Sequence, residues 1–146
     1  MKVLVPLDGS EVAECVLPVL EVWAKKLDLE ITLFSAITYP GPDWPGGRDV
    51  TTLEEGEMSK YLKSKHAELT AKGFKVATAM REGNPPQAIL DVATEGDYDL
   101  IAMSTHGRSG VARWVMGSVT DKVLTASPIP VLVVRGKEAQ RQLGRG

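Results

Sequence analysis

Three glycines and a serine follow an apolar run in the C-terminal third of this 146-residue sequence. Residues 104–123 read STHGRSGVARWVMGSVTDKV, with glycines at positions 107, 110 and 117 and a serine at 118. Glycine permits backbone conformations that are closed to other residues, and it lets a bound group come within hydrogen-bonding distance of main-chain N–H groups. A turn of this composition is therefore suited to binding an anion.

The end of this stretch also carries the signs of a helix start. The run SVTD matches the spacing of a capping box and predicts Ser118 as the N-cap of a helix over residues 119–125. Free N–H groups and the positive end of the helix dipole favour a phosphate there, Gly117 would let it approach, and Thr120 adds a hydroxyl donor. Arg108 either supplies a positive charge or is a solvated loop residue. In the competing interpretation, the glycines and the serine only punctuate the fold.

A carboxylate stands at the end of the first apolar run. Asp8 follows residues 2–7, KVLVPL, whose continuous apolar character is typical of a strand buried on both faces of a parallel sheet. In nucleotide-binding folds, an acidic residue can bind ribose hydroxyls or the exocyclic amine of a base. Asp8 could equally cap the first helix. Both interpretations stay open at this stage.

Other chemistries have less support in the sequence. There is no G-x-x-x-x-G-K-[ST] motif, no G-x-G-x-x-G after the first strand, and residues 107–110 miss the spacing of a nucleophile elbow by one position. His66 and His106 are too few and too scattered for a metal site, so we expect a solvated His66 and a His106 that supports its loop. Cys15, the single cysteine, is expected to be a small core or boundary residue.

Strand and helix patterns alternate along the chain. The expected strands are residues 2–7, 29–38, 74–80, 98–103 and 129–134. Helices are expected from Ser10 to Leu27, over 51–72, after Asn84, and over 119–125. We expect Pro18 to kink the first helix, Gly73 to end the second, and Asn84 to be the N-cap of the third, followed by proline in its first turn, with Ala88, Ile89, Val92 and Ala93 facing inward.

This alternation predicts an α/β fold, a Rossmann-like open twisted five-stranded parallel sheet with helices on both faces. In such sheets, ligands bind outside the carboxyl ends of the strands, where the strand order reverses. With the order 3-2-1-4-5, the loop after Asp8 and the loop after Met103 would face one crevice. Residues 39–49 are rich in proline and glycine and are expected to form a loop, which is either a lid over the base, with Trp44 as a reporter, or a surface loop.

The composition is that of one ordinary globular domain, expected over residues 1–136, with a polar and mobile tail at 137–146. Lys and Arg number 17 against 19 Asp and Glu, for a formal net charge of −2, so nucleic acid and anionic membranes are not expected as partners. We also expect no signal peptide and no membrane span, and hence a cytoplasmic protein.

The residues quoted above resemble the universal stress protein family over residues 2–135. Its ATP-binding members carry G-x-x-G-x9-G-[ST] after the fourth strand; here STHG at 104–107 is followed by nine residues and then by Gly117-Ser118. VPLDGS near the start and SPIPVLVV near the end are similar to the family's first and last strands. One departure is Ser104, which stands where the pattern has its first glycine. We expect this serine to weaken the fit at most, unless the position requires a positive φ.

The resemblance implies the strand order 3-2-1-4-5 and a site for ATP, with Mg²⁺ or Mn²⁺ held mainly by the phosphates. It implies an adenosine pocket formed by Pro6, Leu7, Asp8 and Ala36. The crevice would then be lined by Met103, Ser104, His106, Gly107 and Arg108. The phosphates would be held by Gly117, Ser118, Val119 and Thr120. The resemblance also implies a homodimer in which the fifth strands, residues 129–134, pair antiparallel. A bare apolar edge strand of this kind would otherwise favour aggregation.

From these observations we expect a nucleotide-binding switch or sensor in the stress response, acting on a protein partner that the sequence does not identify, with at most slow ATP hydrolysis. No catalytic residue is assigned. The alternative is a dimeric adaptor of the same fold that binds no nucleotide. A flavin or electron-transfer protein would also fit this strand order.

Overall fold

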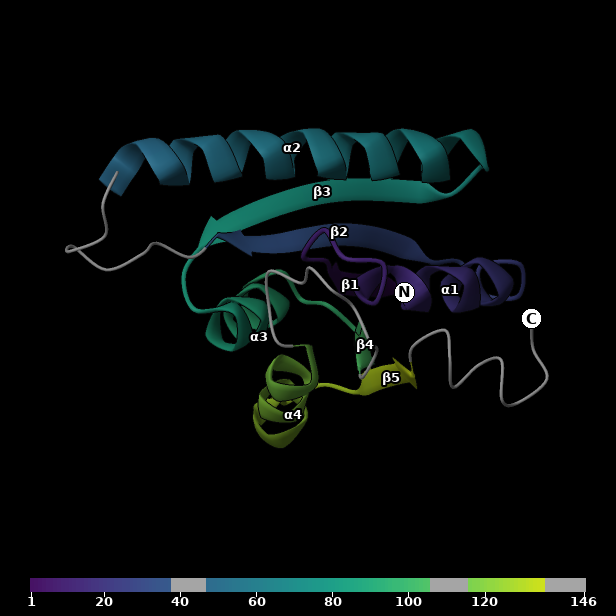
Figure 1. Ribbon diagram of the computed structural model, residues 1–146. Helices are drawn as coiled ribbons and strands as arrows, with labels where there is room; N and C mark the ends of the chain where they lie inside the picture. Colours follow the sequence, from purple (N-terminus) through teal and green to yellow (C-terminus); the bar gives the residue numbers. More distant parts are fainter. Residues whose placement is uncertain (38–46, 106–115, 136–146) are drawn as a thin grey trace.

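The computed structural model of the chain describes residues 1–37, 47–105 and 116–135 (Figure 1). In chain order the elements are β1 (Lys2–Pro6), the 3₁₀ helix η1 (Ala13–Val16), α1 (Leu17–Trp23), β2 (Glu30–Ile37), α2 (Gly47–Ala71), β3 (Lys75–Glu82), α3 (Pro85–Glu95), β4 (Leu100–Thr105), α4 (Met116–Ala126) and β5 (Val131–Arg135). Strands and helices alternate as the sequence predicts. No helix in the described ranges is long and apolar enough to cross a membrane.

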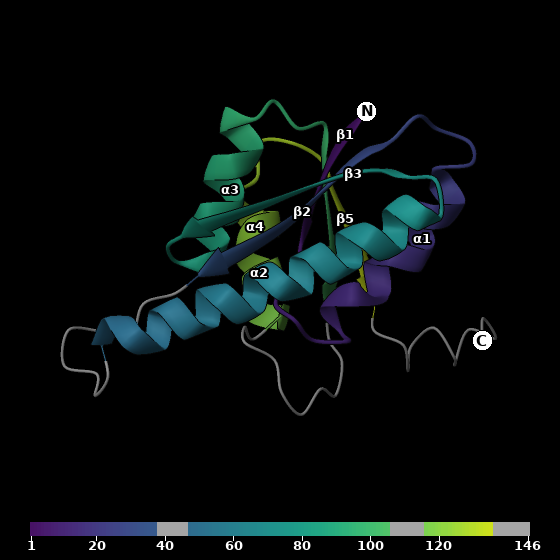
Figure 2. The same ribbon diagram turned by 90° about the horizontal axis from the view of Figure 1, so that it is seen from above.

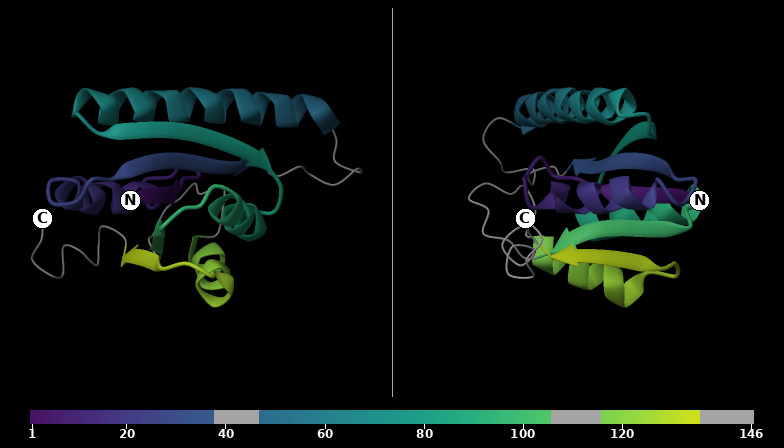
Figure 3. Two further views of the ribbon diagram at one scale, coloured as in Figure 1. Left: turned by 180° about the vertical axis from the view of Figure 1, so that it is seen from behind. Right: turned by 90° about the vertical axis from the view of Figure 1, so that its right-hand side faces the viewer.

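The five strands form one parallel sheet in the order β3-β2-β1-β4-β5. Figure 3 shows this order from β3, beside α2, to β5 at the opposite edge. The predicted topology is confirmed. Because all strands run the same way, their carboxyl ends lie together on one side, called here the carboxyl end of the sheet, and their starts form the amino end.

Helices cover both faces of the sheet. Seen from above, η1, α1 and α2 lie on one face, and α3 and α4 pack side by side on the other (Figure 2). This division follows from the right-handed crossover of each strand-helix-strand unit. The central strand β1 is sealed on both sides, with Val3, Leu4 and Val5 fully buried. Its continuous apolar run thus meets the requirement of a strand between two helical layers.

The first helix differs from the prediction of one long, kinked helix. The segment begins as the 3₁₀ helix η1 and becomes α-helical only at Leu17, so that Pro18 lies in the first turn of α1. A proline there removes no intrahelical hydrogen bond, because first-turn N–H groups have no partner in the helix. Regular helix ends at Trp23, and Leu27 is 43% exposed in the turn that follows. The expected kink is therefore a helix start.

The boundaries of α2 and α3 show which local signals were reliable. Gly73 follows α2 with φ of 94°, a left-handed conformation that glycine adopts at low cost, and it ends the helix as predicted. Asn84 is the N-cap of α3 with prolines in the first turn, although its side chain makes no capping hydrogen bond. Helix α2 begins at Gly47, so the last three residues of the predicted loop 39–49 are helical. Residues 39–46, which include Trp44, lie outside the part of the chain that the structure describes.

Candidate functional site

The point where the strand order reverses lies between β1 and β4. Strand β1 pairs with β2 on one side and with β4 on the other, where Val3 is in register with Leu100 and Leu4 with Ile101. The chain segments that leave β1 and β4 therefore start next to each other at the carboxyl end of the sheet. One of these segments contains Asp8, as the sequence analysis predicts.

Asp8 is buried, with 1% of its surface exposed, and it organises the turn into η1. Its Oδ1 atom accepts hydrogen bonds from the Ser10 amide at 2.9 Å and from the Ser10 hydroxyl at 2.5 Å. The Ser10 hydroxyl oxygen in turn accepts a bond from the Ala13 amide at 3.2 Å. Asp8 is not the cap of the first helix, because the N-cap of η1 is Val12, which has no side-chain cap bond; the carboxylate instead fixes the turn that precedes this helix. Its contact with a ligand stays a prediction.

Ser104 lies near the end of β4, and its side chain joins two parts of the site. The residue is fully buried, and its hydroxyl donates to the carbonyl oxygen of Ala13 at 3.2 Å. Among the described non-glycine residues, the only positive φ belongs to Asp97, so Ser104 does not occupy a backbone position that requires glycine. The serine therefore fits the strand without strain, and it makes a bond to η1 that glycine could not make.

Thr120 connects α4 to the same place. It is fully buried, and its hydroxyl donates to the carbonyl oxygen of Ser104 at 3.0 Å. The Thr120 hydroxyl proton is therefore engaged in a hydrogen bond between α4 and β4. Together with the bonds above, this contact links the turn after β1, η1, the end of β4 and α4 through one continuous set of buried polar groups.

The start of α4 differs from the prediction. The helix begins at Met116, so the exposed Ser118 lies in its first turn and is not the N-cap of a helix over residues 119–125. The capping-box spacing was misleading because it identifies a possible cap without excluding an earlier helix start. Gly117 and Ser118 still belong to the first turn, whose N–H groups have no intrahelical acceptor and lie at the positive end of the helix dipole. The feature that favours an anion is therefore retained.

The other predicted site residues divide into two groups. The side chains of Pro6, Leu7, Ala36, Met103 and Val119 are buried at the ends of β1, β2 and β4 and inside α4. Three further residues, His106, Gly107 and Arg108, lie outside the described part of the chain. Leu7, Ala36, Met103 and Val119 belong to the hydrophobic core, so they place apolar groups and no charge beneath the carboxyl ends of the strands.

Ser35 is a candidate that the sequence analysis did not identify. It precedes Ala36 on β2, is fully buried, and its hydroxyl has no hydrogen-bond partner in the part of the chain that the structure describes. The neighbouring Leu7 amide donates to Phe34 at 2.8 Å, which places Ser35 beside the chain leaving β1. An unpaired buried hydroxyl is costly, so it marks a position where a ligand or a water would find a partner. A polar residue inside the apolar run ITLFSAI was the available signal.

A second set of residues missed by sequence reasoning lies on α2 and η1. The Tyr61 hydroxyl donates to Glu14 Oε2 at 2.5 Å, and the Lys65 ammonium lies 2.7 Å from Glu14 Oε1. Burial, the hydrogen bond to Glu14, and the negative charges of Glu14 and Asp8 together raise the pKa of Tyr61 far above its ordinary value. Tyr61 therefore stays neutral and is within electrostatic reach of Asp8.

The remaining candidates from the sequence have structural explanations. Cys15 is buried and its thiol donates to the Glu11 carbonyl, which confirms a core or boundary position. His66 was expected to be solvated, but it is half-buried and its Nε2 lies 3.0 Å from the Val76 carbonyl. Within residues 1–37, 47–105 and 116–135, no group of three or more His, Cys, Asp or Glu could hold a metal ion.

Comparison with known proteins agrees with this architecture. The sequence model of the universal stress protein family matches residues 1–135. The universal stress protein MJ0531 of Methanocaldococcus jannaschii is 32% identical over 141 residues, covering 92% of this chain and 81% of that protein.

Two solved structures extend the comparison. The hypothetical protein MJ0577 of the same organism superposes with a TM-score of 0.71 at 29% identity, covering 93% of this chain and 96% of that one. A universal stress protein family member of Arabidopsis thaliana, solved with AMP bound, gives a TM-score of 0.70 at 16% identity, covering 96% and 94%. The family match over almost the whole chain, together with the strand order, shows that this chain belongs to the universal stress protein family.

Proposed function

We propose that this chain binds an adenine nucleotide, ATP in the first place, in the crevice at the carboxyl ends of β1 and β4. The observation that carries the proposal is the convergence of the buried Asp8 turn and the N-terminal turn of α4 at the point where strand order reverses. One provides a carboxylate beside apolar residues, and the other provides the N–H groups and the positive dipole end of a helix start. These are the two chemistries that a nucleoside and its phosphates need.

Within this proposal, each group of residues has one task. The base lies against Pro6, Leu7, Ala36 and Met103, and Asp8 faces the ribose. Gly117, Ser118, Val119 and Thr120 hold the phosphates, mainly through main-chain N–H groups because the Thr120 hydroxyl donates to Ser104. Ser104, His106, Gly107 and Arg108 complete the crevice. Mg²⁺ or Mn²⁺ accompanies ATP and is held mainly by its phosphate oxygens.

We assign the nucleotide a switching or sensing role in the stress response, in the cytoplasm where ATP is supplied. Rapid hydrolysis requires a residue that orients the attacking water, and the sequence offers no motif for one. Turnover should therefore stay below about 1 per second, the lower end of ordinary kinase rates. The AMP bound in the Arabidopsis relative supports an adenine nucleotide as a ligand of this fold.

We also propose that two copies pair through β5. Four successive apolar residues of this edge strand, Val131–Val134, are only half-buried in the single chain. An edge strand with this composition gains hydrogen bonds and apolar burial by pairing with a second copy. In this arrangement the protein partner of the switch would meet a dimer. Light scattering of the purified protein should give a mass about twice that of one chain.

The proposed binding is tested by thermal unfolding with ATP and Mg²⁺, compared with AMP, cyclic AMP and GTP. Binding to the native state alone should stabilise it by about 2.7 kcal/mol at a hundredfold excess over the Kd. Gly117→Val should abolish this gain, because a branched side chain would stand where a phosphate must approach. Gly56→Val is the matched control, since a side chain there meets nothing within 4 Å. No stabilisation at millimolar ATP would instead favour the adaptor that binds no nucleotide.

A further inference from the structure

The 3₁₀ helix η1 is held in place by side chains from other elements. It has four residues, Ala13–Val16, and follows the Asp8 turn directly. A 3₁₀ helix this short has weak internal hydrogen bonding and little stability of its own. Its position is therefore set by the core packing of Ala13 and Val16, by α1, which continues it, and by polar contacts with other elements.

Two of these contacts come from opposite sides. From β4, the Ser104 hydroxyl binds the carbonyl oxygen of Ala13. From α2, Tyr61 and Lys65 bind the two carboxylate oxygens of Glu14, the next residue along, at 2.5 and 2.7 Å. The Lys65 and Glu14 side chains are only 21% and 23% exposed, so solvent screens this ion pair incompletely. Adjacent residues of η1 are thus fixed to the sheet and to α2.

The hydrogen bonds continue from η1 to the Asp8 carboxylate. The Ala13 amide donates to the Ser10 hydroxyl, and this hydroxyl donates to Asp8 Oδ1. A displacement of η1 would lengthen the first of these bonds and leave the second without its support. The position of η1 is thereby coupled to the geometry of the Asp8 turn through two hydrogen bonds.

We propose that Tyr61 and Glu14 are positioning residues for the nucleotide site. Their contact holds η1 so that Asp8 and the chain leaving β1 keep the geometry that the ligand needs: Glu14 belongs to η1, and Tyr61 reaches it from α2, which lies on the same face of the sheet. The inference rests on the proposed nucleotide binding. It assigns to α2 a contribution to binding that the glycine-containing sequence after β4 does not reveal.

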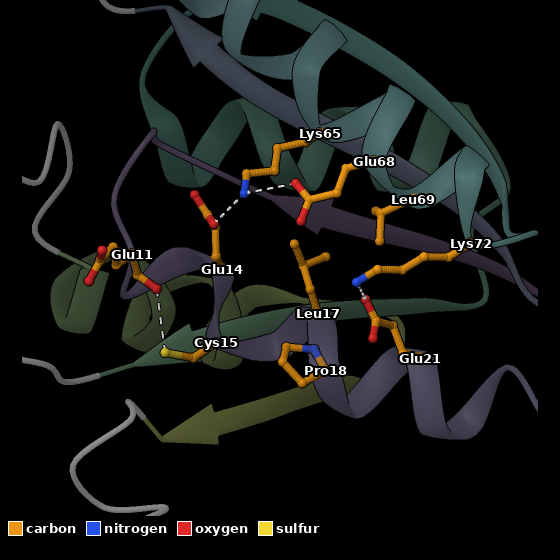
Figure 4. Close-up of a pocket in the computed structure, with 10 residues that line it drawn as sticks. All are labelled: Glu11, Glu14, Cys15, Leu17, Pro18, Glu21, Lys65, Glu68, Leu69 and Lys72. Atoms are coloured by element: carbon orange, nitrogen blue, oxygen red, sulfur yellow. Dashed lines mark hydrogen bonds and ion pairs between the residues drawn. The ribbon is translucent and has the colours of Figure 1, made fainter. Parts of the chain in front are cut away.

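A second polar contact between the same two segments provides the control. Lys72, the residue directly after α2, lies 3.0 Å from Glu21 on α1, and both belong to the lining of a cavity of about 270 Å³ between α2 and the η1–α1 segment (Figure 4). This pair is more exposed, at 49% and 28%, and it is attached to regular α-helix instead of η1. Breaking it loosens the packing of α2 without touching the bonds that lead to Asp8.

The test compares Tyr61→Phe with Lys72→Met in the full chain. Loss of the partly buried Tyr61–Glu14 hydrogen bond, about 1 kcal/mol, corresponds to about a fivefold change in an equilibrium constant. We expect Tyr61→Phe to weaken ATP·Mg²⁺ binding about fivefold by calorimetry, and Lys72→Met to change it less than twofold. Ser10→Ala removes the hydroxyl that connects Ala13 to Asp8. In this background, the change in log Kd caused by Tyr61→Phe should be less than half of the change that it causes in the wild type.

Amide hydrogen exchange supplies a readout that needs no nucleotide. The Ser10 and Ala13 amides bind Asp8 and Ser10, so Tyr61→Phe should speed their exchange about fivefold, while Lys72→Met should leave them unchanged. If the wild type binds ATP and the two variants bind it with equal affinity, the positioning role is overturned and the proposed nucleotide binding stands. Unchanged exchange at both amides would also overturn the positioning role. A wild-type protein that binds no nucleotide would overturn the proposed function, and with it the role assigned to Tyr61 in binding.

Discussion

Each end of the sheet has a hydrogen bond from a backbone amide to an aspartate, but the two aspartates differ in their exposure to solvent. At the amino end, Asp99 Oδ2 accepts a bond from the Lys2 amide at 2.8 Å, and Asp99 is exposed. At the carboxyl end, Asp8 Oδ1 accepts a bond from the Ser10 amide at 2.9 Å, and Asp8 is buried. Both carboxylates bind a backbone N–H group near β1. Only the second does so away from water.

Burial of polar groups distinguishes the carboxyl end as a whole. Its buried polar residues are Asp8, Ser10, Ser35, Ser104, Thr105 and Thr120. At the amino end, the Lys75 and Asp28 side chains that form an ion pair are 64% and 80% exposed. Burying a polar group costs free energy unless every such group finds a partner. The carboxyl end therefore has a more demanding structure than the fold alone requires, which is typical of a binding site.

The largest effect expected from this comparison is on Asp8. Asp8→Ala should lower the free energy of unfolding by about 2–3 kcal/mol, because it removes the acceptor of two hydrogen bonds inside the protein. Asp99→Ala should cost less than about 1 kcal/mol, since its exposed partner can bind water instead. Urea unfolding of both variants measures the difference. Equal costs would show that burial at the carboxyl end has no special consequence.

The next effect concerns Ser104, where the family pattern has glycine. Ser104→Gly should destabilise the protein by about 1–2 kcal/mol, through the lost bond to Ala13 and the added backbone freedom of glycine in a strand. Ser104→Ala removes only the hydroxyl and should account for about 1 kcal/mol of this. If Ser104→Gly proved more stable than the wild type in denaturant unfolding, the serine would be a strained substitution and not a link between β4 and η1.

The smallest effect should appear only at high pH. Burial lowers the pKa of Lys65, but its bonds and charge interactions with Glu14 and Glu68 outweigh this and leave the pKa raised, and the pKa of Tyr61 is raised as well. Both groups hold their protons more tightly in the folded state than in the unfolded chain. Their stabilising contributions are therefore complete below about pH 10 and are lost as the pH rises above it.

Tyr61→Phe isolates the tyrosine part of this dependence. Above about pH 10, the wild type should lose up to about 1.4 kcal/mol per pH unit more than the variant, the value for one proton. Urea unfolding between pH 8 and 11 measures both slopes. Parallel curves would show that folding does not raise the pKa of the Tyr61 hydroxyl above that of a tyrosine in the unfolded chain.

Most of the fold could be predicted because its signals are local. The buried run of β1, the alternation of strands with helices, and Gly73 after α2 each depend on a few neighbouring residues. Helix starts were predicted less well. Pro18 was expected to kink a long helix and lies in the first turn of α1, while Ser118 was expected to begin a helix that begins at Met116. The same residue types occur at a cap and inside a first turn, so the sequence pattern alone does not distinguish them.

The neighbouring carboxyl ends of β1 and β4 could be predicted, but the bonds between them could not. The sequence pattern predicts a strand order that places the segment after β1, with Asp8, beside the end of β4, and this order is confirmed. The bond from Ser104 joins residues 91 positions apart, and the bond from Tyr61 joins residues 47 positions apart. Such contacts depend on how the helices pack on the sheet, which leaves no periodic pattern in the sequence. Ser104 was expected to weaken the fit of a ligand at most; its position requires no positive φ, and its bond to Ala13 was not predicted.

Backbone amide chemical shifts report nucleotide binding at the carboxyl end of the sheet residue by residue. In a ¹H–¹⁵N titration with ATP and Mg²⁺, we predict saturating shifts at Asp8, Ser10, Ser104, Gly117 and Ser118. The amides of Lys2 and Asp99, at the amino end, should stay unchanged as internal controls. Saturating shifts confined to the amino end, or no shifts at millimolar ATP, would show that no nucleotide binds at the carboxyl end.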